Sequence, residues 1–318
     1  MQEKPKGFVP VMLTPFTEVG LVDLRALTSL TEFYINAGAT GLFANCQSSE
    51  MFELTESESL KVIAHVLKVA NGKVPVVAAC SIAGNVAMQA DFVKRAHALG
   101  VQAVIIITGL LGGEEDSDEY LNSRIYQLFE LTEDIPLGFY ECPEPYKRLL
   151  KAHQLGRFVS TGRVIYHKDT CLDIEQVQAK IAATAKYSLF GLYDAYMGHA
   201  VASLRSGAAG LSCIQGNYFP ELIVWLCQHF DQHHFTSEVN LVQQFLIENM
   251  EVMHAAYPIV SKYFLQKRGL SISLFSRREI EPFNNKAKLS IDKLYTDYTR
   301  LANYLELPKA IQSHKNIS

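Results

Sequence analysis

The chain lacks the features by which several classes of protein are recognised. Its six cysteines, at positions 46, 80, 142, 171, 213 and 227, include no C-x-x-C pair, so the sequence supports neither a zinc site nor a disulfide framework. No apolar run approaches the length of a membrane span, the first residues lack a signal-peptide core, and the net charge of −4 comes from interspersed signs. We therefore expect a cytoplasmic protein with reduced thiols and no metal, and neither nucleic acid nor membrane as a partner.

Apolar residues, in contrast, are abundant. They make up 48% of the 318 positions, against 19% for charged residues, which excludes disorder and allows a sizeable core. Short apolar runs recur about every 30 residues, each followed by a helical pattern. The runs are continuous rather than alternating, which is typical of parallel strands buried on both faces. The expected strands are 8–16, 41–46, 74–81, 103–109, 137–142, 163–168, 188–193 and 210–214, with amphipathic helices such as 55–70, 86–99 and 174–185.

Eight strand–helix units predict an α/β fold, a closed (β/α)8 TIM barrel. An open doubly wound sheet is the alternative, but the G-x-G-x-x-G phosphate turn of that fold is missing from the sequence. We expect the barrel to occupy residues 1–230, with 220–230 as its last helix. Residues 231–318 are expected to form a C-terminal helical extension packed on the barrel, with helices at 238–256, 258–268 and 284–305.

Two residues at the ends of neighbouring strands carry the functional prediction. The active site of such a barrel lies at the carboxyl ends of its strands, where Tyr140 ends the fifth and Lys168 the sixth. A buried lysine amine can form a Schiff base with a carbonyl substrate, and a phenol beside it can move protons. The alternatives are a surface lysine that pairs with Asp169 and an ordinary core tyrosine. Strand alternation places His167 on the face opposite Lys168, where we expect it to pack against a helix.

A polar turn, residues 46–50 with the sequence C-Q-S-S-E, follows the second strand. Its hydroxyls and backbone N–H groups suit a substrate carboxylate, although an ordinary capped turn is the alternative interpretation. The predicted substrate-binding residues are Gln47, Ser48, Ser49, Thr14 at the end of the first strand and Ser212 in the eighth.

Taken in order, these segments resemble the family of dihydrodipicolinate synthase and N-acetylneuraminate lyase, the pyruvate-dependent class I aldolases. The matching pieces are V-M-L-T-P-F at 11–16 with V-D at 22–23, Gly41 with S-S-E at 48–50, Tyr140-x-x-Pro143, Lys168-Asp169, and G-A-A-G at 207–210 with Asn217. The resemblance implies that Lys168 is the Schiff-base lysine and Tyr140 the proton shuttle, with Gln47 and Ser48 holding the keto acid carboxylate. It also implies a homo-oligomer, a dimer or tetramer, that needs no metal or organic cofactor.

The sequence departs from both founding members of that family. The family's turn has two glycines that are absent here, and the tyrosine that follows strand 4 in the synthases is replaced by Leu111. The position of the synthase arginine is Pro145, with Lys147 and Arg148 close by. The Asp-Glu pair of the lyases corresponds to residues 197–198, Met-Gly. The resemblance therefore extends to the general chemistry and leaves the second substrate open.

Four functions remain as hypotheses. The leading one is a Schiff-base lyase that cleaves or forms a carbon–carbon bond between pyruvate, or another 2-oxo acid, and an aldehyde. A dehydratase or deaminase of a 2-keto-3-deoxy sugar acid would use the same imine. A non-catalytic keto-acid-binding homologue and an unrelated phosphate-binding barrel enzyme are the others. In the first two, Lys147, Asp194 and Tyr196 are candidates for reading distal hydroxyls or a second acid group.

Overall fold

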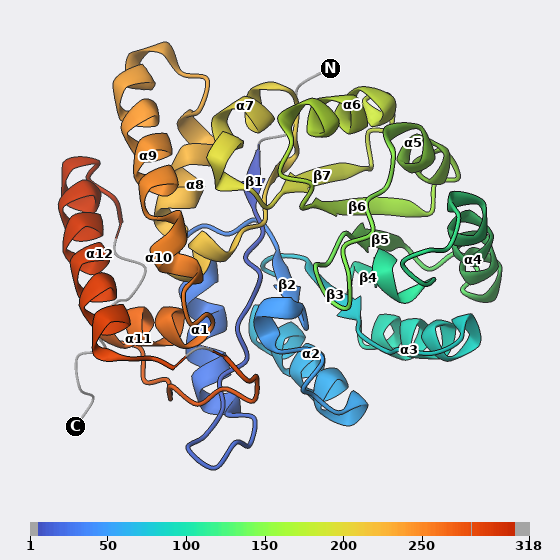
Figure 1. The fold of residues 1–318 in the computed structure, drawn as a ribbon, viewed down its shortest axis with the longest axis horizontal. Coiled ribbons are helices and arrows are strands. Elements are labelled where there is room, and N and C mark those ends of the chain that lie inside the picture. The colour runs from blue at the N-terminus through green and yellow to red at the C-terminus, as the bar shows by residue number, and fades with distance from the viewer. Residues whose placement is uncertain (1–5, 281, 309–318) are drawn as a thin grey trace.

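The computed structural model describes residues 6–280 and 282–308. Eight parallel strands form one sheet in the order β1-β8-β7-β6-β5-β4-β3-β2, and helices surround it (Figure 1). The strands are β1 Gly7–Phe8, β2 Leu42–Ala44, β3 Val76–Cys80, β4 Ala103–Ile107, β5 Leu137–Tyr140, β6 Val164–Asp169, β7 Gly191–Asp194 and β8 Gly210–Leu211. The helices between and after them are α1 Leu24–Asn36, α2 Glu56–Ala70, α3 Val86–Ala98, α4 Asp118–Leu131, α5 Ala152–Ser160, α6 Ile174–Thr184, α7 Ala200–Arg205 and α8 Pro220–His229.

A single parallel bridge between Val11 and Phe43 joins the segment after β1 to β2 and closes the cylinder. Two backbone hydrogen bonds flank it: the Phe43 N–H donates to the Pro10 carbonyl, and the Met12 N–H donates to the Phe43 carbonyl, each at 3.0 Å. The predicted (β/α)8 barrel is thereby confirmed.

The first strand is much shorter than predicted. Residues 8–16 were expected to be one strand, but β1 ends at Phe8. Beyond it the Val9 N–H still donates to the Leu211 carbonyl at 3.0 Å, and Val11 and Phe16 form isolated bridges. Pro10 and Pro15 lack the N–H that a sheet ladder requires. A prediction based on apolar character alone therefore made the strand too long. The backbones of β1 and β8 lie very close together where they pair. A Cβ added to Gly210 would lie 1.7 Å from the Gly7 carbonyl oxygen, so only glycine fits there.

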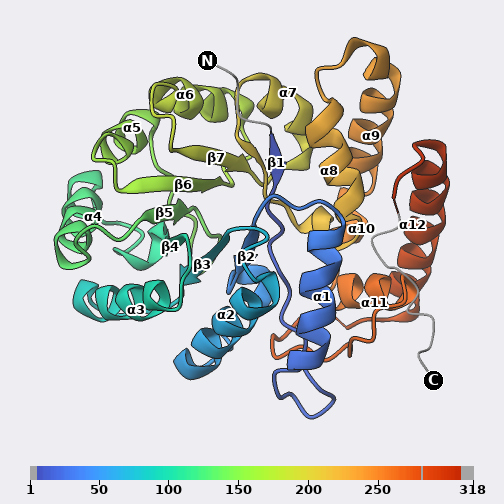
Figure 2. The ribbon, with the colours of Figure 1, turned by 180° about the vertical axis from the view of Figure 1, so that it is seen from behind.

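The described part of the C-terminal extension contains α9 Thr236–Glu248, α10 Met250–His254, α11 Ile259–Lys267 and α12 Asn285–Tyr304 (Figures 1 and 2). The helix expected over 238–256 is interrupted at Asn249, which caps α9 and whose side chain donates to the Phe245 carbonyl at 2.9 Å. Aromatic packing and a buried ion pair between Arg268 and Glu221 fix α11 against α8. No helix in the described ranges is long and apolar enough to cross a membrane.

Candidate active site

Lys168 lies at the end of β6, paired in register with Tyr140 of β5 and Tyr193 of β7. Its side chain is buried, and Nζ lies 4.1 Å from the centre of the Tyr140 ring. Burial lowers the pKa of Lys168, and the three nearby thiols of Cys46, Cys142 and Cys213 oppose that shift. Within residues 6–280 and 282–308 the amine forms no ion pair with any carboxylate. The alternative of a surface lysine paired with Asp169 is therefore wrong.

Tyr140 presents its hydroxyl to the turn after β2. The phenol donates to Gln47 Oε1 at 3.3 Å, and its ring packs edge-on against Phe43. Burial raises the pKa of Tyr140 well above its usual value, and the neighbouring Cys142 thiol acts in the same direction. The phenol is therefore neutral at ordinary pH and holds a transferable proton close to the Lys168 amine.

A cavity of about 400 Å³ opens over these two residues. It is large enough for a small acid with several further carbons. Among the predicted substrate-binding residues, Gln47, Ser48 and Ser212 line it, together with the two catalytic candidates. Ser212 is also tied into the barrel, since its hydroxyl donates to the Val9 carbonyl at 2.8 Å and accepts from Tyr166 at 3.2 Å.

Ser49 and Thr14, also predicted to bind substrate, do not line this cavity. The Ser49 hydroxyl donates to the Met12 carbonyl at 2.6 Å and accepts from the Cys46 N–H at 3.0 Å, so it fixes the turn against the segment after β1. Thr14 is fully buried, and its hydroxyl has no partner among the described residues. A polar residue beside a strand end can point into the wall instead of the cavity, and the sequence alone does not distinguish the two.

Glu50, the last residue of the turn, is anchored by the C-terminal extension. Its carboxylate accepts from Lys262 at 2.8 Å, from the Ser276 hydroxyl at 2.9 Å and from the Arg277 N–H at 2.7 Å. Glu50 also adopts a left-handed backbone conformation, with φ of 58°. The ion pair with Lys262 is fully buried, so the extension determines the shape of the turn that carries Gln47 and Ser48.

Among the residues expected to read distal hydroxyls or a second acid group of the substrate, Lys147 and Tyr196 line the cavity. The Lys147 ammonium donates to the Thr170 carbonyl at 2.9 Å. Arg148 is not a cavity residue, because it pairs with Asp118 at 2.9 Å on the outside. Asp194 is buried and accepts from the Tyr196 N–H at 2.9 Å, which also removes it from the cavity surface. Leu111 is buried in the core.

The extension contributes cavity residues that sequence reasoning missed: Met250, His254, Tyr257 and Arg278. Tyr257 is the most informative of them, because it lines the cavity together with Ser48 and its hydroxyl accepts from Asn217 Nδ2 at 2.7 Å. Its position in the sequence, far from any strand end, gave no signal that would have identified it.

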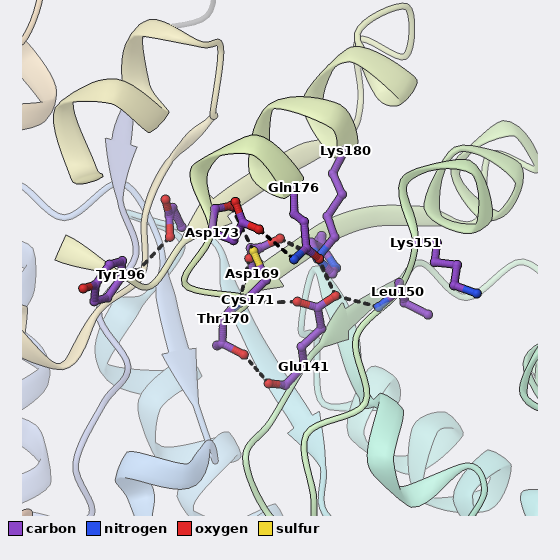
Figure 3. A network of polar contacts seen from close by, with 12 residues as sticks. Glu141, Leu150, Lys151, Asp169, Thr170, Cys171, Asp173, Gln176, Lys180 and Tyr196 are labelled. Carbon is purple, nitrogen blue, oxygen red and sulfur yellow. Dashed lines mark hydrogen bonds and ion pairs between the residues drawn. The ribbon is translucent and has the colours of Figure 1, made fainter. Parts of the chain in front are cut away.

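A cluster of buried charges joins Glu141 after β5, Asp169 at the end of β6 and Lys180 of α6 (Figure 3). The Lys180 ammonium of α6 lies 2.7 Å from Glu141 Oε1 and 2.7 Å from Asp169 Oδ2. Burial alone would raise the pKa of Asp169, but the neighbouring His167 ring and the charge of Lys180 hold it far below its usual range. Because residues alternate along a strand, the neighbours of Tyr140 and Lys168 point outward into this cluster.

His167 was expected to pack against a helix on the face opposite Lys168. It does lie on that face, but its ring faces two buried carboxylates instead of apolar helix residues: Nε2 is 3.6 Å from Glu141 and 3.5 Å from Asp169. These three residues could together hold a metal ion by spacing. However, the Lys180 ammonium already bridges the two carboxylates, so the donor set fits a salt bridge better than a cation site.

Comparison with known proteins agrees with this geometry. A model of the Dihydrodipicolinate synthetase family matches residues 4–297. A 4-hydroxy-tetrahydrodipicolinate synthase of Ruegeria pomeroyi is 26% identical over 292 residues, which are 90% of this chain and 96% of that protein. Among solved structures, YagE of E. coli K12 in complex with pyruvate is 19% identical, with a TM-score of 0.82 over 93% of this chain and 98% of that one. A monomeric dihydrodipicolinate synthase variant is 20% identical, with a TM-score of 0.83 over 92% and 97%. The structural likenesses establish the fold.

Proposed function

The chain belongs to the dihydrodipicolinate synthetase family, and from its site we propose that it is a Schiff-base-forming lyase acting on pyruvate or a related 2-oxo acid. The proposed reaction cleaves or forms a carbon–carbon bond between that acid and an aldehyde. The observation that carries the proposal is Lys168, which is 4% exposed, faces the cavity and lacks an anionic partner among the described residues. A buried lysine ammonium without an anionic partner lowers the stability of the fold. Its lowered pKa increases the fraction of neutral amine, which is the nucleophilic form.

In the proposed mechanism the Lys168 Nζ attacks the keto carbon of the bound acid. The resulting carbinolamine loses its hydroxyl as water, with the needed proton supplied by the neutral phenol of Tyr140. The protonated imine is an electron sink for the bond between the third and fourth carbons of the acid. The Tyr140 phenolate left by the first proton transfer takes the proton of the hydroxyl on the fourth carbon, that carbon–carbon bond breaks, and an aldehyde leaves while an enamine remains on Lys168. Protonation and hydrolysis of the enamine then release pyruvate. Every step takes place on the lysine, so the reaction needs no metal or organic cofactor.

Hydroxyl and amide groups are proposed to hold the acid. Gln47 and Ser48 begin a short helical turn, whose first N–H groups have no partner within the turn. Together with the Ser48 hydroxyl they suit the carboxylate of the 2-oxo acid, and Ser212 also lines the cavity. Lys147 and Tyr196 are proposed to contact the second half of the substrate.

Borohydride trapping tests the proposal directly. The protein is incubated with pyruvate and sodium borohydride, and its intact mass and peptide map are determined. We expect one reduced pyruvate adduct per chain, on Lys168. Lys168→Ala should give none, whereas Lys61→Ala, which removes an exposed lysine of α2, should behave like the wild type.

The other outcomes separate the remaining candidates. An adduct only with longer 2-keto-3-deoxy acids would favour the dehydratase or deaminase. No adduct with any 2-oxo acid would leave the non-catalytic binder as the better account. A homodimer or homotetramer is proposed alongside, and light scattering after gel filtration measures it.

A further inference from the structure

The cavity over Lys168 changes character from its inner end to its outer part. At the inner end, hydroxyl and amide side chains line it together with Lys168 and Tyr140 at the strand ends. Beyond the strand ends, the loops after β5, β6, β7 and β8 and the start of α10 contribute six side chains that are apolar or aromatic. These residues, here called the outer apolar wall, are Pro143, Leu172, Ala195, Tyr196, Ile214 and Met250.

Leu172 of this wall is held in a backbone conformation that disfavours leucine. Its φ of 64° lies in the left-handed region, which is strained for a bulky side chain. The residue before it is anchored, since the Cys171 N–H donates to Asp169 Oδ1 at 2.8 Å (Figure 3). The residue after it, Asp173, caps α6 by accepting from the Glu175 N–H at 2.9 Å. Leu172 is nonetheless 53% exposed, so an apolar ligand group that covers it in the cavity would offset the strain.

Apart from Lys168, the lysine and the arginine that line the cavity are already engaged. Arg278 forms ion pairs with Glu144 and, at 3.7 Å, with Glu53. Lys147 is exposed to solvent, and its ammonium donates to the Thr170 carbonyl at 2.9 Å. A second acid group on the substrate would therefore compete with a carboxylate at the arginine and with water at the lysine.

A chain of sugar hydroxyls would also find few partners in the outer part of the cavity. In the part of the chain that the structure describes, no aspartate, glutamate or asparagine lines the cavity, and Gln215 of the loop after β8 is buried. Each hydroxyl that loses water on binding needs a hydrogen-bond partner, whereas an apolar group gains free energy by leaving water for the outer apolar wall. The lining therefore favours an aldehyde without hydroxyl or acid groups.

We propose that the aldehyde partner of the reaction carries an apolar body, and that Leu172 is a specificity-determining residue that packs against it. The inference rests on the proposed function and names the class of its second substrate. In the direction of condensation, the enamine on Lys168 attacks the aldehyde carbon, and the phenol of Tyr140 gives its proton to the aldehyde oxygen. Water then hydrolyses the imine, which frees Lys168 and releases a 4-hydroxy-2-oxo acid with an apolar end.

The test measures the condensation of pyruvate with three aldehydes: benzaldehyde, which is apolar, glyceraldehyde, which carries hydroxyls, and glyoxylate, which carries an acid group. We expect the wild-type kcat/KM for benzaldehyde to exceed that for each of the others by about tenfold or more. Leu172→Asn keeps a similar shape and tolerates the left-handed backbone, but it makes the side chain polar. It should lower kcat/KM for benzaldehyde about tenfold and change that for glyceraldehyde less than about threefold.

Two further variants keep the assignment falsifiable. Leu172→Gly removes the side chain and adopts the left-handed backbone without strain, so it should lose the preference for benzaldehyde as well. Leu189→Asn changes an exposed leucine that does not line the cavity, and it should alter kcat/KM for none of the three aldehydes. Thermal unfolding confirms that each variant is folded.

The contrary results are distinct. A wild type that converts glyceraldehyde or glyoxylate in preference to benzaldehyde would overturn the inference. Equal changes for benzaldehyde and glyceraldehyde in the Leu172 variants, or none, would overturn the role of Leu172. A pyruvate adduct on Lys168 without turnover of any of the three aldehydes would refute the apolar partner and leave the imine chemistry standing. If the wild type formed no adduct with any 2-oxo acid, the proposed function would fail first, and this inference with it.

Discussion

Replacing Lys180 by methionine tests the buried charge cluster behind the active site. Its ammonium lies 2.7 Å from both Glu141 Oε1 and Asp169 Oδ2, and all three side chains are buried. Methionine keeps most of the volume but removes the charge, which leaves two neighbouring carboxylates uncompensated. Breaking a buried pair in this way typically costs about 3–5 kcal/mol, so we expect the free energy of unfolding to fall by that amount at pH 7.

The same variant should respond to pH in a defined direction. In the wild type the pKa of Asp169 is depressed, so its contribution is present above the unfolded-state value of about 3.9 and is lost as the pH falls further. In Lys180→Met the folded-state pKa of Asp169 should instead lie above its unfolded value. The variant then recovers stability as the pH falls from 7 towards about 4, as Asp169 takes up a proton.

Urea unfolding at pH 7 and pH 5 measures both effects. The difference from wild type should be smaller at pH 5, and adding Asp169→Asn to Lys180→Met should restore part of the loss at pH 7. Lys61→Ala is the control on an exposed lysine. A loss below about 1 kcal/mol at pH 7, or a loss independent of pH, would show that the cluster does not act as a compensated set of charges.

Four further predictions concern the site itself. Lys168→Met should abolish adduct formation yet raise the free energy of unfolding at pH 7, because it removes a desolvated ammonium whose pKa is lowered by burial; lower stability than wild type would contradict this. For the same reason the rate of imine trapping should rise with pH through a midpoint below the ordinary lysine value of about 10.4, and a midpoint at or above that value would refute the desolvation argument. Tyr140→Phe should slow turnover about 10²–10⁴-fold once an aldehyde partner is identified, and near-normal turnover would exclude the phenol as the proton carrier. Glu50→Gln should lower the melting temperature by leaving the buried Lys262 ammonium without its carboxylate, and an unchanged melting temperature would mean that the turn is held in another way.

Much of the site could be predicted because it depends on position along a strand. Lys168 and Tyr140 end neighbouring strands, and parallel pairing in register brings their Cα atoms opposite each other whatever the loops do. Strand alternation also placed His167 on the outer face correctly. It could not show that Glu141, Asp169 and Lys180 would meet there, since a polar residue on an outward face is usually solvated.

The sequence by itself determined the barrel, through continuous apolar runs separated by amphipathic helices, and the positions of Lys168 and Tyr140 at the ends of neighbouring strands. The tertiary structure alone decided which hydroxyls reach the cavity: the Ser49 hydroxyl bonds to the Met12 carbonyl in the wall, whereas Tyr257 of the extension lines the cavity. The tertiary structure alone also brought Glu50 and Lys262 together as an ion pair, although they are 212 residues apart in the chain. Periodicity records which face of an element is buried, but a contact between distant segments depends on how loops and helices pack, and no local pattern encodes that.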